Sequence, residues 1–306
     1  MTGYLLRRLL RGVTTLLGTT LVIFLLVRVA PADPAVSIAG PKADPETLAA
    51  IRKDLGLDDP LAVQYVRYVG QVAHGDLGRS YMTGRRVRDV ILERLPATAL
   101  LALTAIGLGF LLGLATGLVT AARAGSRVDM AVLVATLLGL SLPTFYLGNI
   151  LIYLFGYRLR WLPLGGYGTL RHLALPAATL GIAHFFFYAR FVHTNVAGTL
   201  AADYVRTARA KGAGPLRIYF HHALRNALIP IVTLLGLDVA ALMSGVVLTE
   251  TVFNWPGLGR LAVQAVFNLD IPVVAGTVLF SATLVLASNL AVDVLYGAID
   301  PRVRRG

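Results

Sequence analysis

The run from Ala97 to Ala122 contains no charged side chain. A helix of about 20 consecutive apolar residues crosses a bilayer, and uncharged runs of this length are not typical of soluble domains. Similar runs recur along the chain, since 56% of its 306 residues are hydrophobic, 14% are charged and the mean hydropathy is +0.71. The sequence therefore predicts an all-α membrane protein that crosses the bilayer several times.

Six apolar segments are expected to be transmembrane helices. The first has three arginines at its start (Arg7, Arg8 and Arg11), is too long for a signal-peptide core and precedes no clear cleavage site, so it should be retained. The second has a small-residue face for close packing, and Pro143 should kink the third because proline removes a helix hydrogen bond. The small-residue face of the second segment consists of Gly107, Gly109, Gly113 and Gly117. The six segments are Leu9–Val29, Ala97–Ala122, Met130–Tyr157, Leu173–Tyr188, Ala227–Thr249 and Ile271–Tyr296.

A long polar region, residues 30–96, separates the first two segments. Apolar positions at helical spacing predict two short amphipathic helices in it, Pro45–Leu55 and Asp59–His74. We expect residues 1–95 to form the first helix plus an extracytoplasmic loop, and residues 96–300 to form a core of five helices.

Lysine and arginine are unevenly distributed around these segments. With both chain ends in the cytoplasm, the short cytoplasmic segments hold 14 of them and the short outer loops hold four. This excess of positive charge on one side is typical of cytoplasmic flanks, so both termini are expected in the cytoplasm. The net charge of +12 is assigned to these flanks, because no basic stripe interleaves with exposed aromatic residues as in nucleic-acid-binding proteins.

The most basic cytoplasmic stretch is Asp203–Pro230, DYVRTARAKGAGPLRIYFHHALRNALIP, between the fourth and fifth segments. It contains five Lys and Arg residues against one acid, Asp203. Two interpretations are open from composition alone: a docking surface for another protein, or a positively charged anchor that fixes the topology.

The chain lacks the usual signatures of catalysis. It has no cysteine, and none of its lysines follows a G-x-x-x-x-G-K-[ST] pattern, so it has no phosphate-binding loop of its own. Its six histidines show no paired metal-ligand spacing, and no G-x-S-x-G elbow is present. The two halves do not show matching broken helices, the pattern typical of secondary carriers. We expect a protein that is not an enzyme, binds no cofactor or metal, and takes any energy for transport from a partner.

The basic stretch also carries a resemblance to a known family. DYVRTARAKG at 203–212, followed by HALRNALIP, resembles the cytoplasmic coupling motif of permease subunits in bacterial binding-protein-dependent ABC importers, in the dipeptide, oligopeptide and nickel branch. Further blocks follow in the same order as in that branch. They are LGLDDPL at 55–61, GDLGRS at 75–80, LPAT at 95–98, VFNWPGLGR at 252–260 and DVLYGAIDP at 293–301.

The resemblance implies a type I importer permease in the bacterial cytoplasmic (inner) membrane. This chain and a second homologous permease subunit would form the translocation pathway. Two cytoplasmic ATPase subunits, or one fused pair, would bind ATP and Mg, and an extracytoplasmic solute-binding protein would deliver the substrate. The long outer loop would cover the pathway, receive the binding protein, or be simple exposed structure.

The family's coupling helix maps onto the cytoplasmic loop 200–230. Ala208, Ala210 and Gly212 would allow close backbone approach to the ATPase, while Tyr204 and Val205 would supply apolar contact. Arg206 stands where the general importer motif has an acid, which weakens the transfer of that acid's role, and Gly212 is retained. The predicted coupling residues are Asp203, Tyr204, Val205, Arg206, Thr207, Ala208, Arg209, Ala210, Lys211 and Gly212.

Three further residues are predicted to serve the pathway or its gate. Asp238 lies inside the fifth segment, where an acid is costly; it either contacts a cationic substrate group or a metal, or is hydrogen-bonded at a helix contact. The family generally has glutamine there. Glu250 forms either an external gate or docking rim, or a solvated membrane-edge residue. Pro143 kinks the third segment either beside the pathway or purely for packing.

The predicted function is import of dipeptides or oligopeptides, with this chain as half of the pathway. The alternative is that the same machinery imports glutathione, nickel or metal chelates. The short loop after the third segment resembles the glutathione and nickel importers as much as it resembles the peptide permeases. A self-sufficient secondary carrier, which would need no ATPase, and a structural subunit without transport are the rivals.

Overall fold

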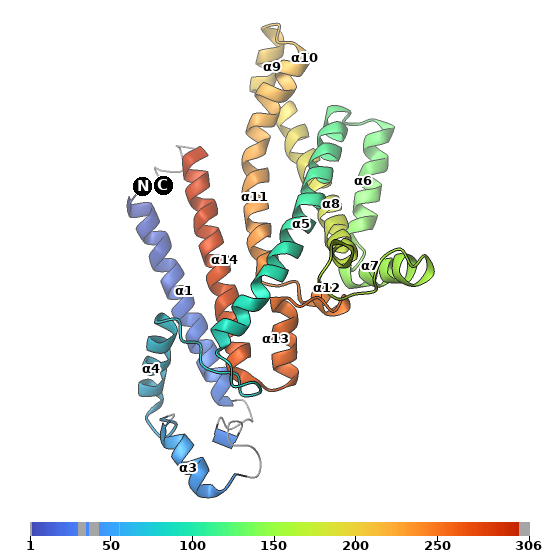
Figure 1. Ribbon diagram of the computed structural model, residues 1–306. Coiled ribbons are helices and arrows are strands. Elements are labelled where there is room, and N and C mark those ends of the chain that lie inside the picture. Colours follow the sequence, from blue (N-terminus) through green and yellow to red (C-terminus); the bar gives the residue numbers. More distant parts are fainter. Residues whose placement is uncertain (1, 30–34, 37–42, 55, 300–306) are drawn as a thin grey trace. The chain divides into compact units, whose positions relative to one another are not determined.

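The computed structural model describes residues 2–29, 35–36, 43–54 and 56–299 (Figure 1). It divides into two compact units, one of Met1–Pro96 with Leu261–Leu286, the other of Ala97–Arg260 with Ala287–Gly306. The described residues are mainly helical and contain no named strand, apart from one isolated bridge between Arg79 and Arg86. The boundaries between the units fall inside helices α5, α13 and α14.

The first unit contains α1 (Thr2–Val29), α3 (Pro45–Asp54), α4 (Leu61–Ala73), most of α13 (Leu258–Phe267) and the first part of α14 (Ile271–Ile299). The two amphipathic helices predicted for the outer loop are confirmed as α3 and α4. α4 packs on α1, where the Tyr65 hydroxyl donates to the Leu17 carbonyl at 3.0 Å and its ring meets Phe24 edge-on. The polar region between the first two apolar segments therefore contributes a helix that packs on α1.

Local chemistry explains where α3 begins. The Asp44 carboxylate accepts hydrogen bonds from the Thr47 backbone N–H at 2.7 Å and from the Thr47 hydroxyl at 2.9 Å, which satisfies the open first turn of the helix. The backbone hydrogen bond from Thr47 is the main reason that the pKa of Asp44 is lowered. Pro45 follows as the first helical residue, a position that proline tolerates well.

A second contact holds the segment that leads into α5. Asp270, which is buried just before α14, accepts a hydrogen bond from the Ser80 hydroxyl at 2.5 Å and from the Tyr81 backbone N–H at 3.0 Å. The GDLGRS block is therefore tied to the start of α14, 190 residues later in the sequence.

The second unit is built around α8 (Leu170–Leu200). It contacts α6 (Arg127–Leu140), α7 (Thr144–Leu151), α11 (Arg225–Met243) and α12 (Val247–Val252). α5 (Val87–Ala122) begins in the first unit and continues here. α8 and α11 lie side by side, and the basic stretch connects their ends (Figure 1).

The predicted small-residue face on the second segment is confirmed for three of its four glycines. A Cβ atom added at Gly109, Gly113 or Gly117 would come within 2.6–2.7 Å of atoms of α8, whereas one added at Gly107 would meet nothing within 4 Å. The glycines allow α5 and α8 to approach each other at backbone distance, which is how membrane helices pack closely.

The third apolar segment is not the single kinked helix that was predicted. α6 ends at Leu140, and α7 with the π-helical segment η1 (Ile152–Arg158) continues at an angle of 95° to it. Pro143 lies just before α7 with an extended backbone, φ −60° and ψ 133°. Because proline cannot donate the hydrogen bond that would continue α6, the chain breaks here rather than bending.

Other boundaries also differ from the prediction. α5 begins ten residues earlier than the predicted second segment, and α8 extends twelve residues beyond the predicted end of the fourth at Tyr188. The fifth segment was predicted to continue to Thr249, but α11 ends at Met243, Gly245 takes φ 112°, and α12 is separate. α13 was not predicted.

Four described helices are long and apolar enough to span a membrane, or five if the bent pair counts as one span. They are Val87–Ala122, Leu170–Leu200, Pro215–Met243 and Ile271–Val292, and the shorter apolar stretch Leu10–Leu26 lies within α1. The total of six spans stays a prediction. The tail at 300–306 and the side chain of Asp293 lie outside the described residues.

Candidate functional site

The predicted coupling stretch folds into a short helix, α9 (Asp203–Ala210), followed by a sharp turn. The Gly212 N–H donates to the Arg209 carbonyl at 3.0 Å and the Ala213 N–H donates to the Ala208 carbonyl at 3.1 Å. This pair of bonds is the Schellman ending of a helix, and it requires a left-handed residue, here Gly212 with φ +82°. Gly212 is therefore explained by its conformation, and no described residue lies within 4 Å of a Cβ added there.

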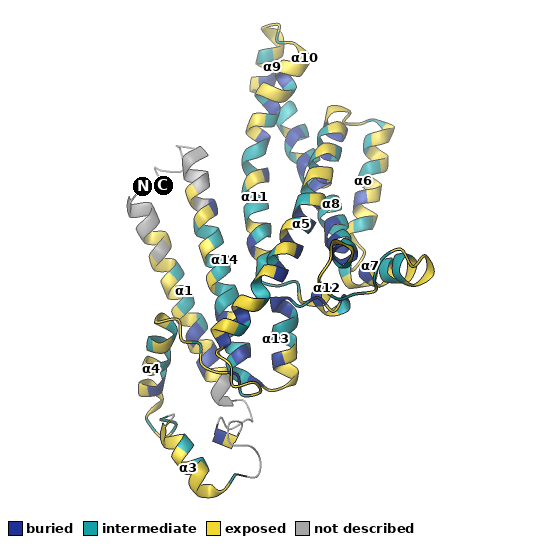
Figure 2. Ribbon diagram, viewed as in Figure 1, coloured by how far each residue is buried: buried dark blue, intermediate teal, exposed yellow. Residues whose placement is uncertain are grey.

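Most of α9 and the following turn are exposed at the end of the helix pair (Figure 2). Arg206, Arg209 and Lys211 are all exposed, and the ion pair between Arg206 and Asp203 is long, at 3.5 Å, with side chains 76% and 96% exposed. Such a pair contributes little to stability. The basic groups are thus free of strong neutralisation within α9.

Val205 corrects the prediction for this helix. It is fully buried, so it does not offer apolar contact to another protein. It instead fixes α9 on its own chain, where α9 packs against the π-helical segment η2 (Ile218–Leu224). Tyr204 is 43% exposed, and its hydroxyl accepts a hydrogen bond from the Asn226 side chain at 3.0 Å.

A rigid base connects this exposed surface to the long helices. η2 contacts both α8 and α11, and the Tyr219 hydroxyl donates to the Leu118 carbonyl near the end of α5. Beneath it, a buried cluster joins α5, α8 and α11: Ala121, Val192, Val196, Ala227 and Ile231. A force applied to α9 would therefore reach three long helices together.

Glu250 is fully buried in α12, which excludes the solvated membrane-edge interpretation. Its Oε1 accepts a hydrogen bond from the Thr98 hydroxyl at 2.8 Å, and its Oε2 accepts one from the Arg260 backbone N–H at 2.9 Å. Thr98 in turn accepts from the Leu258 N–H at 2.8 Å. The carboxylate thus joins α5, α12 and the start of α13 in one buried polar cluster.

The WPGLG block forms the rest of this cluster. Trp255 is 1% exposed and its indole N–H donates to the Ala97 carbonyl at 2.9 Å. Gly257 lies so close to Glu250 that an added Cβ would be 2.1 Å from Oε1. The Glu250 cluster, meaning Thr98, Glu250, Trp255, Gly257, Leu258 and Arg260, explains why VFNWPGLGR needs its glycine and tryptophan.

Asp238 lies on α11 and is neither fully buried nor fully exposed. The Tyr188 hydroxyl, from α8, donates to its Oδ2 at 2.7 Å. This hydrogen bond at a helix contact is the structural alternative foreseen for Asp238, and a pathway role remains a prediction.

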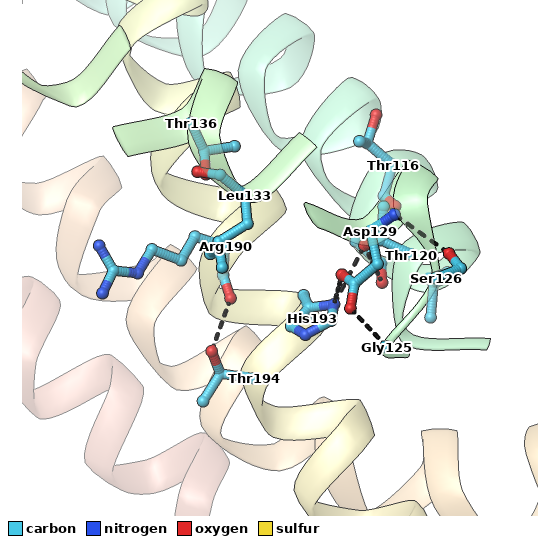
Figure 3. A network of polar contacts seen from close by, with 12 residues as sticks. Thr116, Thr120, Gly125, Ser126, Asp129, Leu133, Thr136, Arg190, His193 and Thr194 are labelled. Atoms are coloured by element: carbon cyan, nitrogen blue, oxygen red, sulfur yellow. Dashed lines mark hydrogen bonds and ion pairs between the residues drawn. The ribbon is translucent and has the colours of Figure 1, made fainter. Parts of the chain in front are cut away.

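Sequence reasoning missed a second polar network, shown in Figure 3. His193 on α8 lies between Asp129 and Thr120, with Nδ1 3.3 Å from Asp129 Oδ1 and 3.2 Å from Thr120 Oγ1. Gly125 N–H donates to Asp129 Oδ2 at 2.8 Å, and the Asp129 N–H donates to the Ser126 side chain at 3.2 Å. The S-x-x-D pattern at Ser126 signals the start of α6, but no local pattern pairs it with His193.

Comparison with known proteins agrees with this arrangement. Residues 109–305 match the family described as binding-protein-dependent transport system inner membrane component, and residues 1–102 match the N-terminal family of such membrane components. The class that these matches define is a transport permease. This chain belongs to the binding-protein-dependent ABC transport permease family.

The relatives are similar along their whole length. The chain is 42% identical to the probable peptide ABC transporter permease protein y4tP of Sinorhizobium fredii, covering 98% of this chain and 99% of that protein. It is 42% identical to the glutathione transport system permease protein GsiC of Salmonella paratyphi A, covering 99% of each. It is 40% identical to the di/tripeptide transport system permease protein DppB of Pseudomonas aeruginosa, again covering 99% of each.

A solved structure supports the fold. A chain of the inward-facing MetNI methionine ABC transporter matches with a TM-score of 0.55 at 21% identity, covering 69% of this chain and 96% of that chain. The type I importer permease fold predicted from the sequence is thereby confirmed, although the number of spans is not.

Proposed function

We propose that this chain is half of the translocation pathway of an ATP-driven importer, and that α9 is where it meets the ATPase. The observation that supports this most is the exposed basic surface of α9, fixed through Val205 and η2 to α8 and α11. Two partner ATPase subunits, or one fused pair, would bind ATP and Mg and hydrolyse the ATP, and this chain would carry no cofactor. A second homologous permease and an extracytoplasmic solute-binding protein complete the assembly.

The orientation follows from charge. Both termini and α9 lie on the cytoplasmic side of the inner membrane in this proposal, since the short basic segments gather there. ATP-driven closure of the ATPases would push on α9, and its rigid base would carry the motion to the long helices as a rigid body.

Peptides are the proposed substrates, because a peptide permease and a di/tripeptide permease are among the relatives with full-length similarity. Import of glutathione by the same machinery is the second candidate, supported by the 42% identity to a glutathione permease. Asp238, Glu250 and Pro143 remain proposed pathway or gate residues. Glu250 would act by holding its buried cluster together, and Pro143 would act by breaking the chain before α7.

Photo-cross-linking tests the proposed contact. A photoreactive residue in place of the exposed Ala210 should, in membranes containing the complete importer, form an adduct with an ATPase subunit. The matched control is the same residue in place of Tyr157, which is 64% exposed and expected on the outer side; it should give no such adduct. Absence of the adduct from position 210, or an equal yield from position 157, would refute the contact.

A further inference from the structure

Asp238 is held in a defined orientation inside an apolar helix. Tyr188, which donates to its Oδ2, is fully buried, and the Phe110 ring meets the Tyr188 ring edge-on at a centroid distance of 5.2 Å. Gly113 on α5 also approaches the Tyr188 Cβ closely. The tyrosine is therefore buried against α5, and it binds one oxygen of the carboxylate while Asp238 stays partly exposed.

Within the part of the chain that the structure describes, Asp238 forms no ion pair. α11 carries no other charged residue after Arg225, and the apolar run of α5 has none between Ala97 and Ala122. On α8 the nearest basic residue is Arg190, which lines a different cavity together with Asp129 and His193. His184, four residues before Tyr188 on α8, has its ring centroid 6.4 Å from that of Tyr188, and its Nδ1 is 2.9 Å from the Leu180 carbonyl.

A partly exposed carboxylate in the apolar run of a spanning helix, five residues before α11 ends at Met243, is costly to place against lipid. The exposed side of α11 at Asp238 must therefore face water or another polar surface within the assembled importer. Since Asp238 forms no ion pair with any described residue, a cation from outside the described residues would be its positive partner.

We propose that Asp238, oriented by Tyr188, forms a cation-binding position in the translocation pathway and takes a positively charged group of the passing solute, such as the α-ammonium group of a peptide. This inference rests on the proposed function and names what the pathway recognises. One carboxylate oxygen stays bound to Tyr188 while the other meets the cation, so the site selects charge without needing a particular side chain.

The absence of native cysteine makes a direct test possible. Ala241 is exposed and lies three residues after Asp238, on the same helix face. In the complete importer carrying Ala241→Cys, and without ATP or peptide, a cationic methanethiosulfonate reagent should react about tenfold faster than an anionic one of similar size. Adding Asp238→Asn should abolish this preference, whereas adding Tyr188→Phe should keep most of it because the charge remains.

Each other outcome overturns the proposal. No reaction at position 241 would mean that this face is covered, and a preference unchanged by Asp238→Asn would mean that the aspartate is not its source. An equal or faster reaction of the anionic reagent would show that a Lys or Arg of the partner permease already neutralises Asp238. The labelling experiment requires neither ATP nor solute. A negative labelling result is therefore distinct from a negative cross-linking result at Ala210, which tests the proposed function. Co-purification of all subunits confirms that each variant assembles.

Discussion

Gly212→Val is expected to reduce ATP-coupled uptake by about tenfold or more while leaving membrane insertion and pairing with the second permease intact. Gly212 has φ +82° and closes the Schellman ending of α9. A β-branched residue in the left-handed region costs about 1–2 kcal/mol, so the turn should rearrange and displace the exposed surface that α9 presents. Uptake and co-purification of ATPase subunits from the same membranes measure the effect.

Two control variants separate the turn from the contact. Asparagine tolerates the left-handed conformation, so Gly212→Asn keeps the turn but adds a side chain. It should preserve uptake if the turn alone matters, and lose it if the ATPase approaches the backbone closely. Gly214 has φ −67° and open space around it, so Gly214→Val should have a much smaller effect. Normal uptake by Gly212→Val would contradict a coupling role for this turn.

Glu250→Ala should lower the free energy of unfolding by about 3 kcal/mol, because it leaves the buried donors of Thr98 and Arg260 without their acceptor. The lower stability should appear as a fall in the midpoint of thermal unfolding of the purified protein in detergent. Glu250→Gln keeps one acceptor oxygen and should lose less.

The matched control is the neighbouring residue. Thr251 is exposed on the same short helix, and its hydroxyl donates a hydrogen bond to the Val247 carbonyl at 2.7 Å. Thr251→Ala should change stability by less than about 0.5 kcal/mol. If Glu250→Ala were equally harmless, the Glu250 cluster would not hold the WPGLG block in place.

The sequence predicted those features that depend on local pattern. Uncharged runs revealed the membrane helices, periodicity revealed α3 and α4, and the spacing of Gly109, Gly113 and Gly117 revealed the packing face that meets α8. The order of motif blocks pointed to the correct family, which the matches over residues 1–102 and 109–305 confirm.

Features that depend on distant residues could not be predicted in this way. Glu250 and Thr98 are 152 residues apart, and Tyr188 and Asp238 are 50 apart, so no periodicity connects them. The sequence predicts a kink at Pro143, whereas the structure has a break between α6 and α7. A proline in an apolar run is compatible with either, and the extended backbone of Pro143, with ψ 133°, distinguishes the break from the kink. Val205 was assigned to a contact surface because a short helix has both buried and exposed sides, and its sequence alone does not say which side faces its own chain.

The source of energy tests the account most directly. The complete importer, reconstituted in proteoliposomes with the binding protein outside, should take up radiolabelled dialanine or glutathione only when ATP is present inside. Uptake should stop when the ATPase subunits are omitted and should persist when a protonophore collapses the proton gradient. Uptake by this chain without ATPase subunits, driven by a proton gradient and abolished by the protonophore, would contradict the account and identify a secondary carrier.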